Sequence, residues 1–439
     1  MAVDLSQLGG LLKRVYTGPL NKAIGERVLL WNDLSSLGMK RTKVVGETIY
    51  WAVLLRGAKG VGFRGANEFL PVGDASTTQQ ANTNLSRFYA TVDVDKMTTE
   101  IAGPSSSSFA DYLTLQMKLI EDEAAFHLNR SLHGDGTGAL ATVTSANTYT
   151  AGTAIPLTHV NGYSFGATQF IEDIDTRVVI TDSTGSTVKK AAKITGIDWD
   201  NGTITLDGDV NTAVGDLVVL GDAFGHSGGS KEAKGLRYII SDGTTDGSAP
   251  DTTLYPEGTL FGIKQTGTGA YRRWKSRILN RSTNEVPYNW DQAYRLVKTC
   301  MARGGKNCIL LMHPSISREH RRLYENDVRY APTNIDFAKG QKTPAINVDG
   351  KMIRIVEDPY LGFQEMIAVE PGDLFKNVIR ELSPDTDGGG KLKQSHGKDA
   401  YWAYWRMYYG IGATNLNRLG RFDGVKVSTD FVADLHKDI

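Results

Sequence analysis

The most regular hydrophobic pattern in the sequence runs from Ser105 to Arg130. Apolar residues recur there every three or four positions, which predicts a helix with one buried face. Serines that can cap a helix stand at its start, and a glycine-rich turn, Gly134 to Gly138, ends it. At about 1.5 Å per residue this helix would be about 40 Å long, close to the diameter of a small domain. Its predicted core-facing residues are Phe109, Leu113, Met117, Ile120, Ala124 and Leu128.

A strand pattern precedes this helix. Thr48 to Leu55 is rich in strand-forming residues, and 88–95 alternate between apolar and polar positions, the period of a half-buried strand. We predict a long two-stranded hairpin over 48–101 with a polar tip over 57–84. An isolated hairpin is marginally stable in water, so we expect another subunit to cover it. The residues expected to make these contacts are Phe63, Arg64, Glu68, Phe69 and Leu70.

The first 47 residues lack a comparable pattern. Gly9-Gly10 and Gly18-Pro19 break them into short pieces, and basic residues outnumber acidic ones up to Lys43. We interpret this segment as an arm that lies along a neighbouring subunit. A solvated arm, or one that faces a polyanion, is the alternative.

Residues 140–233 form a segment of different character. Short runs rich in Thr, Val and Ile are separated by turn signals such as Asn201-Gly202 and Gly215-Asp216. Glycine-rich stretches border the segment on both sides. The pattern predicts a small all-β module, either a barrel or a sandwich.

From residue 234 onward helix and strand patterns mix, so the fold class is α+β. Asn289 with Gln292 has the spacing of a capping box for a helix that ends at Gly304-Gly305. An apolar strand, 308–312, and a charged helix, 316–324, follow it. In the aromatic strand 401–415 we expect core packing ahead of base stacking.

Composition narrows the function classes. The chain has 439 residues, of which 40% are hydrophobic and 22% charged, as in a globular protein. Its 49 basic residues equal its 49 acidic ones, so any contact with nucleic acid must come from a local face. The densest basic run is 271–281, which we interpret as a solvated face with polyanion contact as the alternative. We expect no membrane span, since no stretch reaches about 18 apolar residues.

Few residues suggest reaction chemistry. Cys300 and Cys308 are expected to be core residues in a reducing compartment. His313, beside a proline, is expected to be a turn residue. We predict no catalytic site, no cofactor and no metal site, since the histidines form no HExxH-like pair.

Two short motifs match the sequence signatures of functional sites but lack the structural context that those sites require. Gly60 to Gly65 matches the dinucleotide fingerprint, but Pro71 and a polar run follow it where a helix is required, so we reject nucleotide binding. Gly162 to Gly166 spells a nucleophile elbow around Ser164, but the all-β surroundings favour a surface turn.

The order of the predicted elements is informative. An arm, a hairpin, a long helix ending in Gly134 to Gly138, and Lys234-Gly235-Leu236 follow one another. A helix from Trp290, an apolar strand, Pro314-Ser315 with a charged helix, and a tyrosine-rich terminal strand complete the series. Over nearly the whole chain this order resembles the tailed-bacteriophage major capsid (coat) protein family, with the Hong Kong 97-like fold.

The resemblance implies a domain organisation, with the all-β module as an insertion absent from simpler members. The expected parts are an N-terminal arm, 1–47; an extended loop, 48–101; a spine helix of the peripheral domain, 102–139; the inserted β domain, 140–233; a peripheral/axial connection, 234–289; an axial domain, 290–400; and a return to the peripheral domain, 401–439.

The resemblance also implies a function. Copies of the chain would form pentamers and hexamers of an icosahedral head that encloses the double-stranded DNA genome of a tailed phage. Assembly would take place in the host cytoplasm, and the mature protein would be part of the virion. A separate scaffolding protein, a portal and packaged DNA are the implied partners. The alternatives are a serine hydrolase using Ser164 and another phage structural protein, a decoration or tail component.

Overall fold

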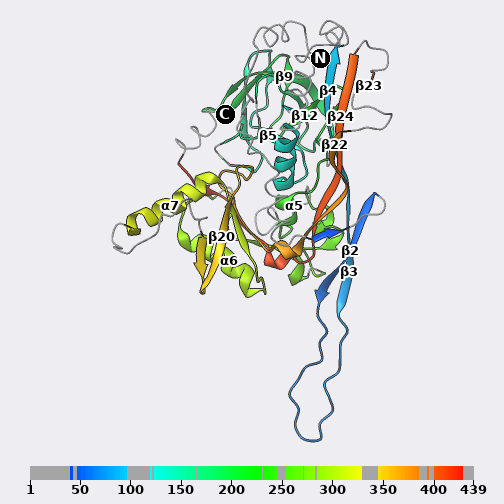
Figure 1. The fold of residues 1–439 in the computed structure, drawn as a ribbon, viewed down its shortest axis with the longest axis vertical. Coiled ribbons are helices and arrows are strands. Elements are labelled where there is room, and N and C mark those ends of the chain that lie inside the picture. The colour runs from blue at the N-terminus through cyan, green and yellow to red at the C-terminus, as the bar shows by residue number, and fades with distance from the viewer. Residues whose placement is uncertain are drawn as a thin grey trace, which may run out of the picture.

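The computed structural model places helices and strands in an α+β arrangement (Figure 1). It describes residues 40–42, 47–95, 119–120, 123–163, 166–171, 173–229, 231–244, 254–269, 271–281, 284–328, 345–384, 393–394 and 400–428. Most of the expected N-terminal arm, 1–47, and the start of the long helix lie outside these residues. Within them, three parts stand out: a sheet that includes the aromatic strand, a second sheet with two helices, and a β-barrel.

The first part is a five-stranded sheet built around the aromatic strand. Its members are β1 (Lys40–Thr42), β22 (Leu374–Pro384), β24 (Ala400–Ala413), β23 (Lys393–Gln394) and β4 (Ser86–Asp95). β24 pairs antiparallel with β4 along its length and with β22 on its other edge. Alternate side chains of β24, from Trp405 to Ala413, are buried. Trp405 and Tyr409 therefore pack in the core as expected, whereas Trp402, Tyr404 and Tyr408 are half-buried.

The second part is a six-stranded sheet covered by α6 (Trp290–Ala302). Its strands, in spatial order, are β16 (Arg277–Ile278), β25 (Gly420–Phe422), β21 (Met366–Val369), β18 (Ile309–Met312), β20 (Lys351–Glu357) and β19 (Ala345–Val348). Asn289 and Gln292 form the predicted capping box at the start of α6. Cys300 on α6 and Cys308 before β18 are buried free thiols, as expected, and burial raises the pKa of Cys308 to about 12.

A second helix, α7 (Pro314–Val328), follows β18. His313 is buried just before it, and its Nδ1 accepts a hydrogen bond from the backbone N–H of Ser315 at 3.2 Å. The predicted turn residue therefore holds the start of a helix.

The third part is a closed barrel, which resolves the choice between barrel and sandwich. Its six strands are β5 (Ala139–Val143), β7 (Ala154–His159), β10 (Thr203–Leu206), β9 (Val188–Asp198), β8 (Arg177–Thr181) and β12 (Leu217–Asp222). Each strand pairs antiparallel with the next, and β12 pairs with both β5 and β8, which closes the ring. β13 (Gly225–His226) pairs antiparallel with the end of β12, while β6 (Thr148–Tyr149) and β11 (Val210–Asn211) pair with each other. Closure leaves these six strands without free edges, and Ile155, Ile180, Ile194 and Ile204 fill the interior.

The hairpin differs from the sequence prediction. β2 (Thr48–Arg56) pairs with β3 (Thr77–Asn84), a stretch predicted to be part of the tip, whereas the alternating stretch 88–95 belongs to β4 in the five-stranded sheet. The prediction failed because β3 has almost no hydrophobic pattern. Of its eight residues only Ala81 and Thr83 are buried, and backbone hydrogen bonds to β2 make it a strand.

The long helix is described over 119–120 and 123–133. Ala124 and Leu128 are buried and Ile120 is half-buried, whereas Phe109, Leu113 and Met117 lie outside the described residues. The helix runs through the middle of the molecule, next to α5 (Leu236–Ile239) (Figure 1). The shorter elements are η1 (Pro256–Gly258), β14 (Thr259–Leu260), β15 (Ile263–Lys264), η2 (Arg272–Trp274), β17 (Val286–Pro287), η3 (Pro371–Asp373), η4 (Leu416–Arg418) and β26 (Val425–Lys426).

Trp274 is one of the largest fully buried side chains, and it packs in the core that also includes Leu128. Its Nε1–H donates a hydrogen bond to the carbonyl of Leu260 at 3.1 Å. Replacing Trp274 with Ala is expected to lower the free energy of unfolding by about 3–5 kcal/mol, because a large cavity forms. Urea denaturation measures this loss. The control Phe224→Ala, at a side chain that is 99% exposed, is expected to change stability little, and equal losses in both variants would contradict the prediction.

Candidate assembly surface

Trp51 anchors the base of the hairpin to the body. Its Nε1–H donates to the carbonyl of Ala413 at 3.0 Å, and its ring packs edge-on against Phe261 and Phe375, with centroids 5.2 and 4.9 Å away. Ile49 and Val53, on the same strand, are also buried. The base of the hairpin therefore belongs to the core, which fixes the direction in which the remainder projects.

The tip of the hairpin, residues 57–76, projects away from the body (Figure 1). At its base the backbones of Lys59 and Asp74 pair, and Arg56 forms an ion pair with Asp74 at 2.8 Å. Beyond this bridge the side chains of Phe63 and Phe69 are 104% and 96% exposed. Val61, Leu70 and Val72 are exposed as well. Apolar side chains gathered on an exposed segment mark an interaction site.

All five side chains expected to contact a neighbouring subunit lie on this tip and are exposed. Glu68 also acts within the tip, because its Oε2 accepts a hydrogen bond from the backbone N–H of Gly65 at 2.9 Å. This hydrogen bond stabilises the local conformation of the tip. The apolar side chains of the tip are not buried by the described residues of the chain.

A buried network of charges supports the part of the body where the long helix ends. Arg237, on α5, lies 3.2 Å from Glu365 and 3.6 Å from Asp423, and Arg421 lies 3.0 Å from Asp423. Burial raises the pKa of Glu365 above its usual value, although the two arginines oppose the shift. Buried charges persist only when they are paired, so these four side chains hold α5 to β21 and β25. The sequence carried no signal for this network, because its members are far apart in the chain and share no motif.

A second polar cluster fixes the barrel to the body. The side-chain amide of Gln169 donates to the carbonyls of Pro359 and Leu361, at 3.2 and 2.6 Å. Its Oε1 lies 2.9 Å from Nε2 of His159, while Nδ1 of His159 accepts from the backbone N–H of Asn161 at 3.0 Å. This pattern requires a neutral imidazole with its proton on Nε2. Burial accordingly lowers the pKa of His159 to about 3.

Packing at this joint is as tight as its hydrogen bonding. Gly166 has a φ of +76°, and a Cβ at that position would lie only 2.0 Å from the ring of Phe363. The ring of His159 also lies 6.4 Å from that of Phe363, measured between centroids. The barrel and the six-stranded sheet therefore form a close-packed contact.

Because His159 is neutral in the folded chain, the stability of the fold is predicted to depend on pH. The unfolded chain binds a proton at this residue below its ordinary pKa of 6.5, but the folded chain does so only near pH 3. The contribution of His159 to stability is thus complete above pH 6.5 and is lost as the pH falls towards 3, at up to about 1.4 kcal/mol per pH unit. Urea denaturation between pH 6 and pH 4.5 is expected to give a shallower pH slope for His159→Asn than for the parent. Equal slopes would contradict this account.

The structure gives no support to nucleotide binding at Gly60 to Gly65 or to a nucleophile elbow at Gly162 to Gly166. Gly60 to Gly65 lies in the projecting tip, and no helix follows it among residues 66–95. Ser164 lies outside the described residues, between Gly162 and Gly166, whose φ angles are +77° and +76°. Within the described part of the chain, no three His, Cys, Asp or Glu side chains are placed to hold a metal ion. No helix among these residues is long and apolar enough to cross a membrane.

The sequence matches no protein-family model and no curated protein, so solved structures supply the comparison. A chain of the capsid asymmetric unit of cyanophage A-1(L) is 12% identical, with 90% of this chain and 92% of that chain covered and a TM-score of 0.51. This chain has the Hong Kong 97-like capsid fold. The capsid chain of a native GTA particle is 9% identical, with 97% and 100% covered and a TM-score of 0.45. The SrpI encapsulin of Synechococcus elongatus is 8% identical, with 97% and 98% covered and a TM-score of 0.43.

The comparison confirms the resemblance drawn from the order of elements, at the level of the fold. Within the Hong Kong 97-like capsid fold, the segment 139–222 is a closed barrel in this chain.

Proposed function

We propose that this chain is the major capsid protein of a tailed double-stranded DNA phage and that its copies assemble into an icosahedral head. The observation that carries the proposal is the projecting hairpin, whose tip holds exposed apolar side chains far from the body. The capsid fold supports the same conclusion. The role is structural: the protein encloses a genome and carries out no reaction.

The hairpin explains why copies would associate. Its tip points away from the body, and full burial of a large apolar side chain contributes about 1.5–3 kcal/mol. Burial of the tip against a second copy would therefore stabilise the association of the two copies by several kcal/mol per tip. Part of this free energy is offset by the entropy lost on association. In a closed shell every subunit packs its own tip against one neighbour and buries the tip of another. Because this contact is repeated around the shell, contacts that are individually weak support a stable particle.

The proposal assigns roles to the parts of the chain. Residues 1–47 are the arm, 48–101 the extended loop, 102–139 the spine-helix segment and 140–233 the inserted β domain. Residues 234–289 connect the peripheral and axial domains, 290–400 form the axial domain and 401–439 return to the peripheral domain. The proposed partners are other copies in pentamers and hexamers, a scaffolding protein, a portal and packaged DNA. Assembly in the host cytoplasm and a final place in the virion follow from the same proposal.

The triple variant Phe63→Ser, Phe69→Ser and Leu70→Ser tests the tip. We expect the subunit to fold with unchanged thermal stability, because these side chains are exposed, but to form no closed shells. Electron microscopy and sedimentation of the purified chain, with and without its co-expressed scaffold, report assembly. The matched control is Phe224→Ser on the turn after β12, an equally exposed apolar side chain, which is expected to leave assembly intact.

Normal shells from the triple variant would overturn this role of the tip. Removal of the whole stretch 57–84 would take out the buried Ala81 on β3 together with the tip. A deletion limited to 58–74, closed by a short turn, removes the tip and keeps the paired strands.

A further inference from the structure

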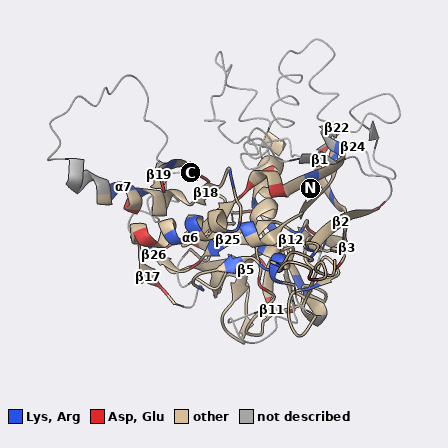
Figure 2. Cartoon of the chain, turned by 90° about the horizontal axis from the view of Figure 1, so that it is seen from below, with Lys and Arg blue, Asp and Glu red and all other residues tan. Residues whose placement is uncertain are grey.

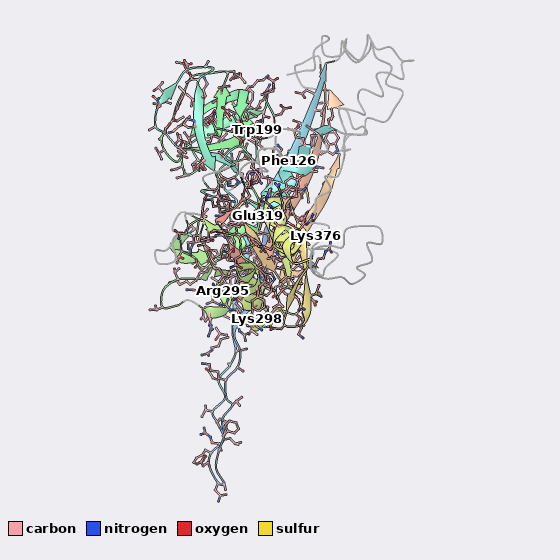
Figure 3. The ribbon with its side chains drawn as sticks, turned by 90° about the vertical axis from the view of Figure 1, so that its left-hand side faces the viewer. Phe126, Trp199, Arg295, Lys298, Glu319 and Lys376 are labelled. Atoms are coloured by element: carbon pink, nitrogen blue, oxygen red, sulfur yellow. The ribbon has the colours of Figure 1, made fainter. Side chains whose placement is uncertain are left out.

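Charge is divided unevenly along this neutral chain. Residues 139–229, which contain the barrel, hold ten acidic and four basic residues, so the other residues hold 45 basic and 39 acidic ones. The barrel, marked by Trp199, and the hairpin lie at opposite ends of the molecule in Figure 3. The acidic surplus is thus concentrated at the end away from the hairpin.

Basic side chains gather where the hairpin leaves the body. Two adjoining hollows of about 490 and 230 Å³ share Arg272 and Arg303 in their walls. The first also includes Arg273 and the hairpin residues 55–59, and the second includes Lys275 and Arg277. We call these five side chains, Arg272, Arg273, Lys275, Arg277 and Arg303, the basic patch. Figure 2, a view from below, shows basic positions close together in the middle of the body, next to α6 and β25.

The charges of this patch are not neutralised by neighbouring carboxylates in the described part of the chain. Asp242, on the wall of the second hollow, pairs with Arg281 at 2.9 Å, and Asp74 pairs with Arg56. Arg303 donates from Nη1 to a carbonyl, that of Asn417, at 3.1 Å. Its pKa is lowered, chiefly by burial, and Arg277 and Arg272 add to the shift through repulsion. Clustered like charges raise the energy of the free protein, so an anion that neutralises them is stabilised there.

The backbone holds these cations in place. Trp274 and Ser276 are buried between the basic residues of the run, and the backbone N–H of Ser276 donates to the carbonyl of Ser241 at 3.0 Å. Alternate residues therefore point into the core, which leaves Arg273, Lys275 and Arg277 on the outer side. A patch presented by a rigid segment loses little conformational entropy when it binds.

We propose that the basic patch binds the phosphate backbone of double-stranded DNA, in addition to the shell-forming role on which this inference rests. Arginine is suited to phosphate because its planar guanidinium donates two parallel hydrogen bonds. The tryptophan of the run is buried and unavailable for stacking on bases, so binding is independent of sequence. The acidic barrel is repelled by DNA, so the two ends of the subunit together orient it with the basic patch towards the genome.

The rival occupant is an acidic surface of a second copy. The hairpin tip does not supply one, because residues 57–76 contain two basic residues, Lys59 and Arg64, and two acidic ones, Glu68 and Asp74. The acidic surplus lies on the barrel, at the opposite end of the molecule. DNA phosphate is therefore the occupant that the charge distribution favours.

The test is the salt dependence of DNA binding by the full-length unassembled chain. Fluorescence anisotropy with a short mixed-sequence duplex is measured between about 50 and 200 mM salt. For Arg272→Gln, Arg273→Gln and Arg277→Gln combined, we expect the slope of log K against log salt to become shallower by about 2.7, or about 0.9 per lost phosphate contact. The single variant Arg273→Gln, at an exposed residue, is expected to change the slope by about 0.9 and keeps the test valid if the triple variant misfolds.

The matched control makes the same change of charge on the barrel, with Lys189→Gln, Lys190→Gln and Lys193→Gln, and is expected to leave the slope unchanged. An unchanged slope in both the triple and the single patch variant would overturn the proposal. The proposal would also be overturned if the patch variants bound DNA normally but no longer formed shells. That result would assign the patch to a contact between copies. If the parent chain forms no shells but the slope changes as expected, the capsid function fails while the DNA-binding patch stands.

Discussion

The contact of Trp51 with the five-stranded sheet constrains the rest of the molecule. A tryptophan at the base of a two-stranded ribbon, hydrogen-bonded to Ala413 and enclosed by Phe261 and Phe375, ties the ribbon to the last strand of the sheet. This contact, together with the buried Ile49 and Val53, fixes the direction of the ribbon, because two paired strands alone are marginal in water. With it, the body stays compact while the apolar residues of the tip are held at a distance from their own core. A chain built in this way buries its core internally and leaves the apolar side chains of its tip exposed.

Sequence reasoning succeeded where one segment carries its own signal. Asn289 and Gln292 cap α6 as their spacing predicted, because a capping box is complete within four residues. Periodic hydrophobic residues identified the β module and the aromatic strand for the same reason. The order of such segments was sufficient for the fold, since a chain can keep its sequence of elements after most residue identities have changed.

Sequence reasoning failed where a strand or a site depends on distant partners. Thr77–Asn84 is polar except for Ala81, and only its pairing with β2 makes it a strand, so the hairpin was assigned the wrong second strand. The network of Arg237, Glu365, Asp423 and Arg421 was missed because no local pattern marks an ion pair between segments. The same holds for the link from Gln169 to the carbonyls at 359 and 361. The basic run near Trp274 was visible in the sequence, but its position at the base of the hairpin came only from the fold.

The closure of the barrel has a consequence for how this protein can change. Its first strand, β5, pairs with its last, β12, and Ala139 stands opposite Val219. Paired strands lie about 4.8 Å apart, so the segment leaves the body and returns to it at nearly the same place. A module with neighbouring ends can be exchanged for another of different size without moving the helix before it or α5 after it. The barrel is therefore a natural attachment point for engineered cargo, and natural variation among chains with this fold is expected to concentrate there.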